Sequence, residues 1–205
     1  AGYTTHASFF DYDLDGDLDC YILNNSFIPV NTLNYANKRE LRAEDWPVAD
    51  FLKGGGDRLL QNNGGKFTDV SKDAGIYGSL IGFGLGVTIG DLNGDHYPDI
   101  YISNDFFERD YLYINQKNGT YKEQLEAVMQ HTSLASMGAD IGDINNDGSG
   151  LNDLLFIPTD AQLGQMNFQT AAQRDADRAA ARGDHRPRHR GPRPGRPGPE
   201  WQCHR

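Results

Sequence analysis

An acidic loop between two apolar runs occurs three times in this chain, and this repetition constrains the fold more than any other feature. The three copies occupy residues 8–25, 87–105 and 139–160. Each has a short apolar run, a loop of Asp, Asn and Gly, and a second apolar run. Repeated units that cannot bury their apolar faces alone bury them against their neighbours. The sequence therefore predicts an array of similar β-sheets.

A second repeated unit follows each of the first two loops. Residues 57–71 and 110–125 both read as strand, Asn-Gly turn and strand, a pattern typical of a β-hairpin. Together the two units supply four short strands per repeat. We therefore predict an all-β fold of four-stranded antiparallel blades, a partial β-propeller of about two to three blades. The wider spacing between the first two loops contains an insertion at about residues 27–56.

Glycines at alternate positions support blades in particular. Gly82, Gly84 and Gly86 precede the second loop and alternate with apolar residues. Small residues on one face of a strand allow neighbouring strands to approach closely, as the innermost strands of a propeller must. The alternative interpretation is a flexible Gly-rich loop, but the apolar residues between the glycines argue against it.

The first acidic loop has the composition of a metal site. Its five carboxylates within nine residues would repel one another without a cation, and oxygen ligands at alternate positions suit Ca²⁺. Gly16 permits the sharp turn around an ion. The candidate ligands are Asp11, Asp13, Asp15, Asp17 and Asp19. Asp17, at position seven, would offer its backbone carbonyl, and the others would bind through their side chains.

The second loop keeps side-chain oxygens at positions one, three, five and nine. Its candidate ligands are Asp91, Asn93, Asp95, Tyr97 and Asp99, with Tyr97 at position seven. His96 stands where the first loop has Gly16, an unfavourable residue if φ is positive there.

The third loop departs from the pattern. Leu151 occupies position nine, and the acid comes two residues late, as if Ser-Gly had been inserted. Its candidate ligands are Asp143, Asn145, Asp147 and Asp153. We therefore expect two calcium sites, and a third that is weaker or empty.

An EF-hand and a turn without metal are the two other interpretations of these loops. An EF-hand requires a Glu at position twelve and flanking helices. Position twelve is Ile22, Ile102 and Leu154 in the three loops, and the flanks read as strands, so this interpretation fails. The other is a turn rich in Asp, Asn and Gly that binds no metal. Two nearly intact copies at equivalent positions of a repeat favour the metal site.

These motifs resemble the FG-GAP/VCBS repeats of integrin α-subunit propellers. Phe83-Gly84 and Gly138-Ala139 lie where the landmarks of that family would fall. Within the family the chain is most similar to the bacterial proteins like cartilage acidic protein, through FFDYDLDGDLD, NDFFERDYLYIN and SMGADIGDINNDG. The resemblance covers roughly residues 3–160. It implies a propeller of about seven blades, Ca²⁺ in the loops, and an extracellular or periplasmic setting, although no signal peptide is visible in this chain.

The charge distribution separates a tail from the repeats. Residues 1–173 hold 25 acidic and 10 basic residues, a net charge of −15, whereas residues 174–205 hold four and nine, a net charge of +5. We expect residues 1–160 to form the propeller fragment. Residues 161–205, where the likeness ends, are expected to be a disordered or artefactual tail. The overall charge of −10 argues against nucleic acid as a partner, and no apolar run is long enough to insert into a membrane.

A binding module is favoured over an enzyme. The chain has no G-x-S-x-G element, H-E-x-x-H motif or phosphate loop. The paired carboxylates lie in a metal-ligand pattern, which would hold their pKa values low. We therefore expect a binding or adhesion module with a protein or glycan partner. The alternative is a polysaccharide lyase on a calcium-bearing propeller, for which His96, Tyr97 and Arg109 are the candidate residues.

Overall fold

The fold was taken from a computed structural model of the whole chain. It describes residues 3–25, 39–105, 108–129, 132, 135–142 and 153–158, the last of these through the backbone alone. All of them belong to the first of the two compact units of the chain, residues 1–171. The predicted tail from residue 161 and the start of the insertion lie outside the described residues.

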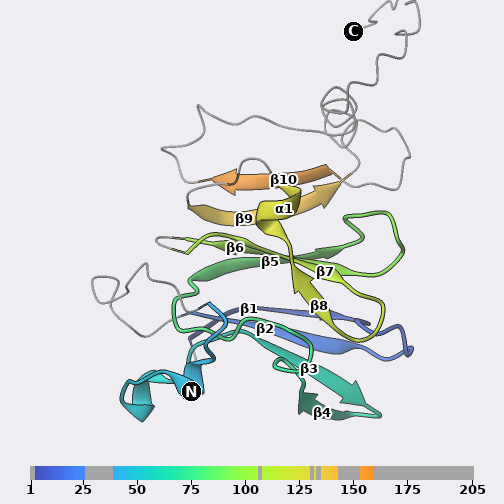
Figure 1. Cartoon of the computed structure of the whole chain (residues 1–205). Coiled ribbons are helices and arrows are strands. Elements are labelled where there is room, and N and C mark those ends of the chain that lie inside the picture. Colours follow the sequence, from blue (N-terminus) through green and yellow to red (C-terminus); the bar gives the residue numbers. More distant parts are fainter. Residues whose placement is uncertain are drawn as a thin grey trace, which may run out of the picture. The chain divides into compact units, whose positions relative to one another are not determined.

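Two four-stranded antiparallel sheets contain most of the described strands, as the repeat pattern predicts (Figure 1). Blade 1 consists of β1 (Tyr3–Phe10), β2 (Asp19–Asn25), β3 (Arg58–Asn63) and β4 (Lys66–Asp69). Blade 2 consists of β5 (Gly84–Gly90), β6 (Asp99–Asn104), β7 (Tyr111–Asn115) and β8 (Tyr121–Glu123). Spatial order follows chain order in both sheets, and both predicted hairpins are present.

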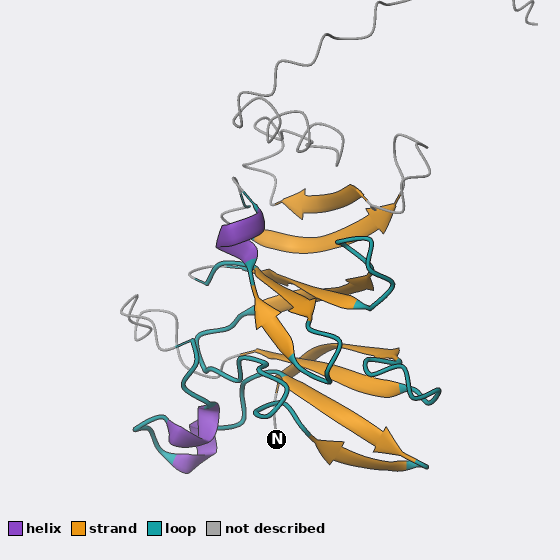
Figure 2. Ribbon diagram, turned by 45° about the vertical axis from the view of Figure 1, so that its right-hand side comes forward, coloured by secondary structure: helices purple, strands orange, loops and turns teal. Residues whose placement is uncertain are grey.

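A third, two-stranded sheet pairs β9 (Ser136–Gly142) with β10 (Asp153–Pro158). Helical structure among the described residues is limited to α1 (Leu125–Val128) and the 3₁₀ turns η2 (Ala43–Asp45) and η3 (Asp50–Leu52) (Figure 2). The fold is therefore all-β, a partial propeller of four-stranded blades.

The same strand register closes each acidic loop. Phe10 pairs with Asp19 in blade 1, and Gly90 pairs with Asp99 in blade 2, so eight residues connect the strands in both. Gly142 pairs with Asp153 in the third sheet, which leaves ten connecting residues. Asp153 is thus the register equivalent of the other two aspartates, in agreement with a two-residue insertion.

The sheets pack face to face, with β5 between β1 and β9 (Figure 1). The Thr5 hydroxyl donates to the Gly84 carbonyl oxygen at 2.8 Å, and the Thr88 hydroxyl donates to the Ala139 carbonyl oxygen at 2.7 Å. Because blade 2 is covered on both faces, all six residues of β6 are buried.

The alternating glycines of β5 allow this close packing. A Cβ on Gly84 would lie 2.3 Å from Leu23 Cδ1 of blade 1, and a Cβ on Gly86 would lie 3.1 Å from the Gly138 Cα of β9. A Cβ on Gly82 would make ordinary contacts only, at 3.9 Å. The prediction from the sequence is confirmed for Gly84 and Gly86, which lie within β5, and not for Gly82.

Tyrosines dominate the core between blades 1 and 2. Tyr21 from β2 packs there together with Tyr111 and Tyr113 from β7, and all three are at most 2% exposed. Leu112, between the last two, points to the opposite face and joins a second cluster toward β9. Alternate residues of one strand therefore serve two cores, as expected of a blade between two neighbours.

Buried carboxyls organise the strand ends opposite the acidic loops. Asp57, before β3, accepts hydrogen bonds from the Tyr21 hydroxyl at 2.9 Å and from the Asn24 N–H at 3.1 Å. Asp110, before β7, repeats this pattern with Tyr101 and Asn104. These two three-residue groups hold the second and third strands of each blade together.

Candidate functional site

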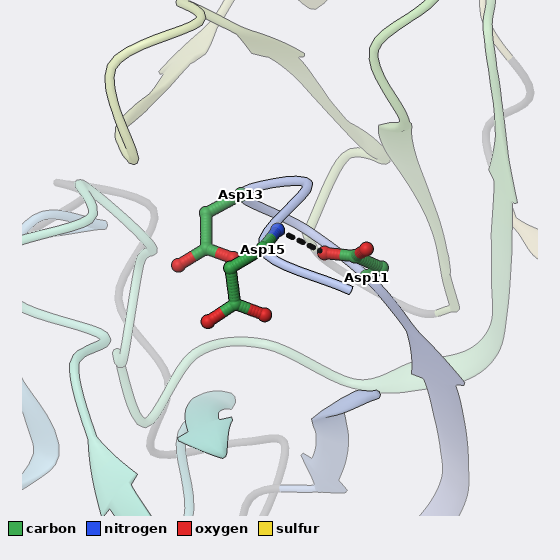
Figure 3. A group of neighbouring side chains, drawn as sticks. All are labelled: Asp11, Asp13 and Asp15. Atoms are coloured by element: carbon green, nitrogen blue, oxygen red, sulfur yellow. Dashed lines mark hydrogen bonds between the residues drawn. The ribbon is translucent and has the colours of Figure 1, made fainter. Parts of the chain in front are cut away.

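The first acidic loop, residues 11–18, connects β1 to β2 and gathers three carboxylates (Figure 3). One carboxylate oxygen each from Asp11, Asp13 and Asp15 lies within 4.8 Å of the other two. Among the described residues, no other group of three His, Cys, Asp or Glu side chains comes this close. This group can hold a cation, as predicted.

Side-chain hydrogen bonds to the backbone shape this loop. The Asp11 carboxylate accepts the N–H of Asp15 at 3.1 Å and of Gly16 at 3.0 Å, and the Asp15 carboxylate accepts the N–H of Asp17 at 3.0 Å. Asp side chains commonly bind backbone amides a few residues ahead in this way. The turn is therefore built by the same residues that would bind the ion.

The aspartate at position nine has a structural role. Asp19 is fully buried, and its two oxygens accept the N–H groups of Tyr12 at 3.0 Å and of Asn62 at 2.8 Å. It closes the loop and ties β2 to the end of β3. The structure does not bring Asp19 or Asp17 into the close group of carboxylates around Asp11.

The second loop, residues 91–98, repeats these hydrogen bonds one by one. The Asp91 carboxylate accepts the N–H of Asp95 at 2.9 Å and of His96 at 2.8 Å. The Asp99 carboxylate accepts the N–H of Leu92 at 3.0 Å and of Asn115, at the end of β7, at 2.9 Å. The two loops thus share one architecture.

Both loops take a left-handed backbone conformation at positions four and six. At position four φ is +60° for Leu14 and +78° for Gly94, and at position six it is +100° for Gly16 and +69° for His96. The positive φ suspected at His96 is confirmed. Each loop therefore places one glycine and one less suitable residue at these two positions.

Unpaired carboxylate oxygens show that the first loop suits a cation. Gln61 Nε2 donates to Asp13 Oδ2 at 2.8 Å, and the Gly64 N–H donates to Asp17 Oδ2 at 3.3 Å. The other oxygen of each carboxylate, Oδ1, is buried without a hydrogen-bond partner among the described residues. A buried carboxylate oxygen is costly unless a donor or a metal ion satisfies it, so these residues fit a bound cation.

In the second loop the oxygens at positions three and five are already engaged. Asp95 Oδ1 accepts the Tyr97 N–H at 3.0 Å, and Oδ2 accepts Asn93 Nδ2 at 3.0 Å and lies 3.3 Å from Lys117 Nζ. The Asn93 Oδ1 accepts the Asp95 N–H at 3.0 Å. Burial opposes ionisation of Asp95, but these hydrogen bonds and the Lys117 ammonium hold its pKa below the usual value.

The carboxyls at position nine have raised pKa values, unlike the low values expected for carboxylates that bind a metal. Burial raises the pKa of Asp99 to about 6, more than the two backbone N–H groups lower it. Burial raises the pKa of Asp19 as well. These two carboxyls lie inside the strand pairing rather than on the loop, and desolvation disfavours their charge.

The third loop is not described by the structure. Asp143, Asn145 and Asp147 lie outside the described residues, and Asp153 is described only as the first residue of β10. A weaker or empty third site therefore stays a prediction.

The residues considered for lyase chemistry do not meet. His96 and Tyr97 lie in the loop that precedes Asp99, at the start of β6. The Arg109 carbonyl accepts a hydrogen bond from Asn104, the last residue of β6, so Arg109 lies at the opposite end of that strand. The Arg109 guanidinium is bound by both oxygens of Glu123, at 3.0 and 2.6 Å. The three side chains therefore form no common site.

Two residues that contact the acidic loops, and two that lie at the opposite ends of the blades, were missed from the sequence. Gln61 and Lys117 reach the loops from the hairpins, and Asp57 and Asp110 organise the far ends of the blades. The sequence could have indicated the two aspartates, because each stands five residues before an Asn in the third strand of its blade, and this spacing recurs in both repeats.

Comparison with known families agrees with the repeat pattern. A family model described as an FG-GAP-like repeat matches residues 91–156, from the second acidic loop to β10. A search of curated proteins found no match. Within the described part of the chain, no helix has the length and apolarity to cross a membrane. Repeats of this family are generally non-enzymatic binding modules and typically extracellular. Residues 91–156 thus match an FG-GAP-like repeat, and the described strands form a partial β-propeller of four-stranded blades.

Proposed function

We propose that this chain is a calcium-binding propeller module for extracellular binding or adhesion. The observation that carries the proposal is the pair of buried, unpaired oxygens on Asp13 and Asp17, in the same loop that gathers the carboxylates of Asp11, Asp13 and Asp15. Calcium takes six to eight oxygen ligands in flexible geometry and prefers carboxylates and carbonyls. The chemistry of this donor set matches calcium better than a metal that prefers nitrogen or sulfur.

Binding of calcium would change the energetics of the loop. Asp11, Asp13 and Asp15 would hold the ion, with Asp17 contributing an oxygen, and the ion would offset the repulsion among these charges. A ligand that binds only the folded chain stabilises it by mass action, by about 2.7 kcal/mol at a hundredfold excess over the dissociation constant. Bound calcium would fix the end of β1 to the start of β2, and with them the loop surface.

The proposed partner is a protein or a glycan in an extracellular or periplasmic setting. Support comes from the FG-GAP-like match and from the sequence likeness to bacterial proteins similar to cartilage acidic protein. Propeller partners contact loops, and the two described acidic loops both follow the first strand of a blade. A glycan and matrix-protein array, probed with calcium and then with EDTA, would identify the class of partner.

Thermal unfolding in EDTA and in millimolar calcium tests the metal function. We expect calcium to raise the melting temperature by roughly 5–10 °C and the double variant Asp13→Asn, Asp17→Asn to lose this increase. The matched control is Asp50→Asn, an aspartate that is 96% exposed on η3 and should keep it. A melting temperature that calcium leaves unchanged would refute the proposal.

A further inference from the structure

We propose that Lys117 acts as a tethered cation in the second acidic loop and makes that loop a weaker calcium site than the first. This inference rests on the proposed calcium function and goes beyond it, because it assigns different affinities to two loops of the same architecture. The residue responsible lies outside both loops, in the turn of the β7–β8 hairpin.

The ammonium of Lys117 lies against two residues of the second loop. Its Nζ lies 3.3 Å from Asp95 Oδ2, the carboxylate at position five. The same Nζ lies 5.3 Å from the ring centroid of Tyr97, the residue at position seven, within the range of a cation–π contact. Two residues of one candidate metal loop therefore already contact a positive charge.

The hairpin turn holds Lys117 in place. Its φ is +62°, and its backbone N–H donates to the Asn115 side-chain oxygen at 2.8 Å. A left-handed lysine is unfavourable and requires such support. Asn115 is also the residue whose own N–H is bound by Asp99 at the end of the second loop. The turn that carries the lysine is thus fastened to the loop that its ammonium contacts.

The two-residue hairpin turn of blade 1 carries no charged side chain. This turn consists of Gly64 and Gly65, and the Gly64 N–H donates to Asp17 Oδ2 at 3.3 Å. The two hairpin turns therefore lie against their acidic loops in the same way, one with a neutral backbone amide and the other with an ammonium.

The charge balance of the loops differs accordingly. The first loop with its position nine has five carboxylates, whereas the second has three, in Asp91, Asp95 and Asp99. Lys117 offsets one of these three. Among the described residues, buried carboxylate oxygens without hydrogen-bond partners occur in the first loop, on Asp13 and Asp17, and not in the second. A divalent ion entering the second loop must displace or tolerate the ammonium, a repulsion that corresponds to roughly tenfold in affinity near a solvated surface.

A calcium titration followed by ¹H–¹⁵N correlation spectra resolves the two loops. The Gly16 amide, bound by Asp11, reports on the first loop, and the Gly94 amide, bound by Asp91, reports on the second. In the wild type we expect the Gly94 midpoint at a calcium concentration at least tenfold above the Gly16 midpoint. In Lys117→Gln the Gly94 midpoint should fall about tenfold, while the Gly16 midpoint stays within twofold.

Two control variants separate charge from structure. Lys117→Arg keeps the charge and should keep the wild-type Gly94 midpoint. Lys122→Gln removes a charge from β8 of the same hairpin and should leave both midpoints unchanged. A Gly94 midpoint in Lys117→Gln within twofold of the wild type overturns the inference, as does joint saturation of both amides in the wild type. If neither amide responds to calcium, the proposed function fails and the inference fails with it.

Discussion

Replacing the buried Asp57 by Asn should remove a contribution to stability that decreases as the pH rises. Asp57 is 6% exposed and lies against the tyrosine core, and this burial raises its pKa from 3.8 to about 7 despite the hydrogen bonds from Asn24 and Tyr21. The folded state then binds this proton more tightly than the unfolded state. Its stabilising contribution is complete below about pH 4 and is lost as the pH rises to about 7.

The change in the free energy of unfolding follows from the difference between the pKa values of Asp57 in the folded and unfolded states. About three pKa units at 1.36 kcal/mol each correspond to an upper limit of about 4 kcal/mol for this residue. Asn is similar in shape to Asp and keeps an oxygen for the Asn24 N–H, but it does not titrate. The free energy of unfolding of the wild type, minus that of Asp57→Asn, should therefore fall by up to about 4 kcal/mol between pH 4 and pH 7.5.

Urea unfolding at several pH values, in EDTA throughout, measures this difference. Asp69→Asn serves as a control of opposite sign: burial opposes ionisation of Asp69, but hydrogen bonds from Ser71 and Arg58 lower its pKa overall. The stability that Asp69 contributes is lost as the pH falls, so its difference curve should rise with pH. A wild-type minus Asp57→Asn difference that stays constant across the range would refute the reasoning.

Two further substitutions test the packing and the loop backbone. Gly84→Ala should lower the free energy of unfolding by about 1–3 kcal/mol through overpacking, because its Cβ would lie 2.3 Å from Leu23. Gly142→Ala, whose Cβ would meet no atom of the described residues within 4 Å, should change little in the same denaturant assay. His96→Gly should raise the free energy of unfolding by up to about 1 kcal/mol, because it relieves a left-handed conformation. Gly16→Ala, at φ +100°, should lower it. Equal melting temperatures for the two variants would contradict this interpretation of the loops.

The strands and hairpins were predictable because their signals are local. The Asn63-Gly64 turn sits between two apolar runs, and the loop from Asp11 carries its own turn-forming side chains. Such features depend on residues a few positions apart, and repetition along the chain makes them stand out.

Which loop residues are free to bind a metal and which hold the fold was not predictable, because this depends on contacts between residues far apart in the sequence. Asp19 reads as one more ligand, yet its Oδ1 is taken by the N–H of Asn62, 43 residues away. Asn115 donates to the Tyr12 carbonyl oxygen of the first loop across 103 residues and so joins the blades. Periodicity in the sequence does not specify which side chains such pairings bring together.

Anomalous diffraction from crystals grown in millimolar calcium tests most directly whether the first acidic loop holds calcium. We expect an anomalous peak bounded by Asp11, Asp13 and Asp15, with an oxygen of Asp17 nearby. A first loop that is ordered in such crystals and carries no peak would contradict it.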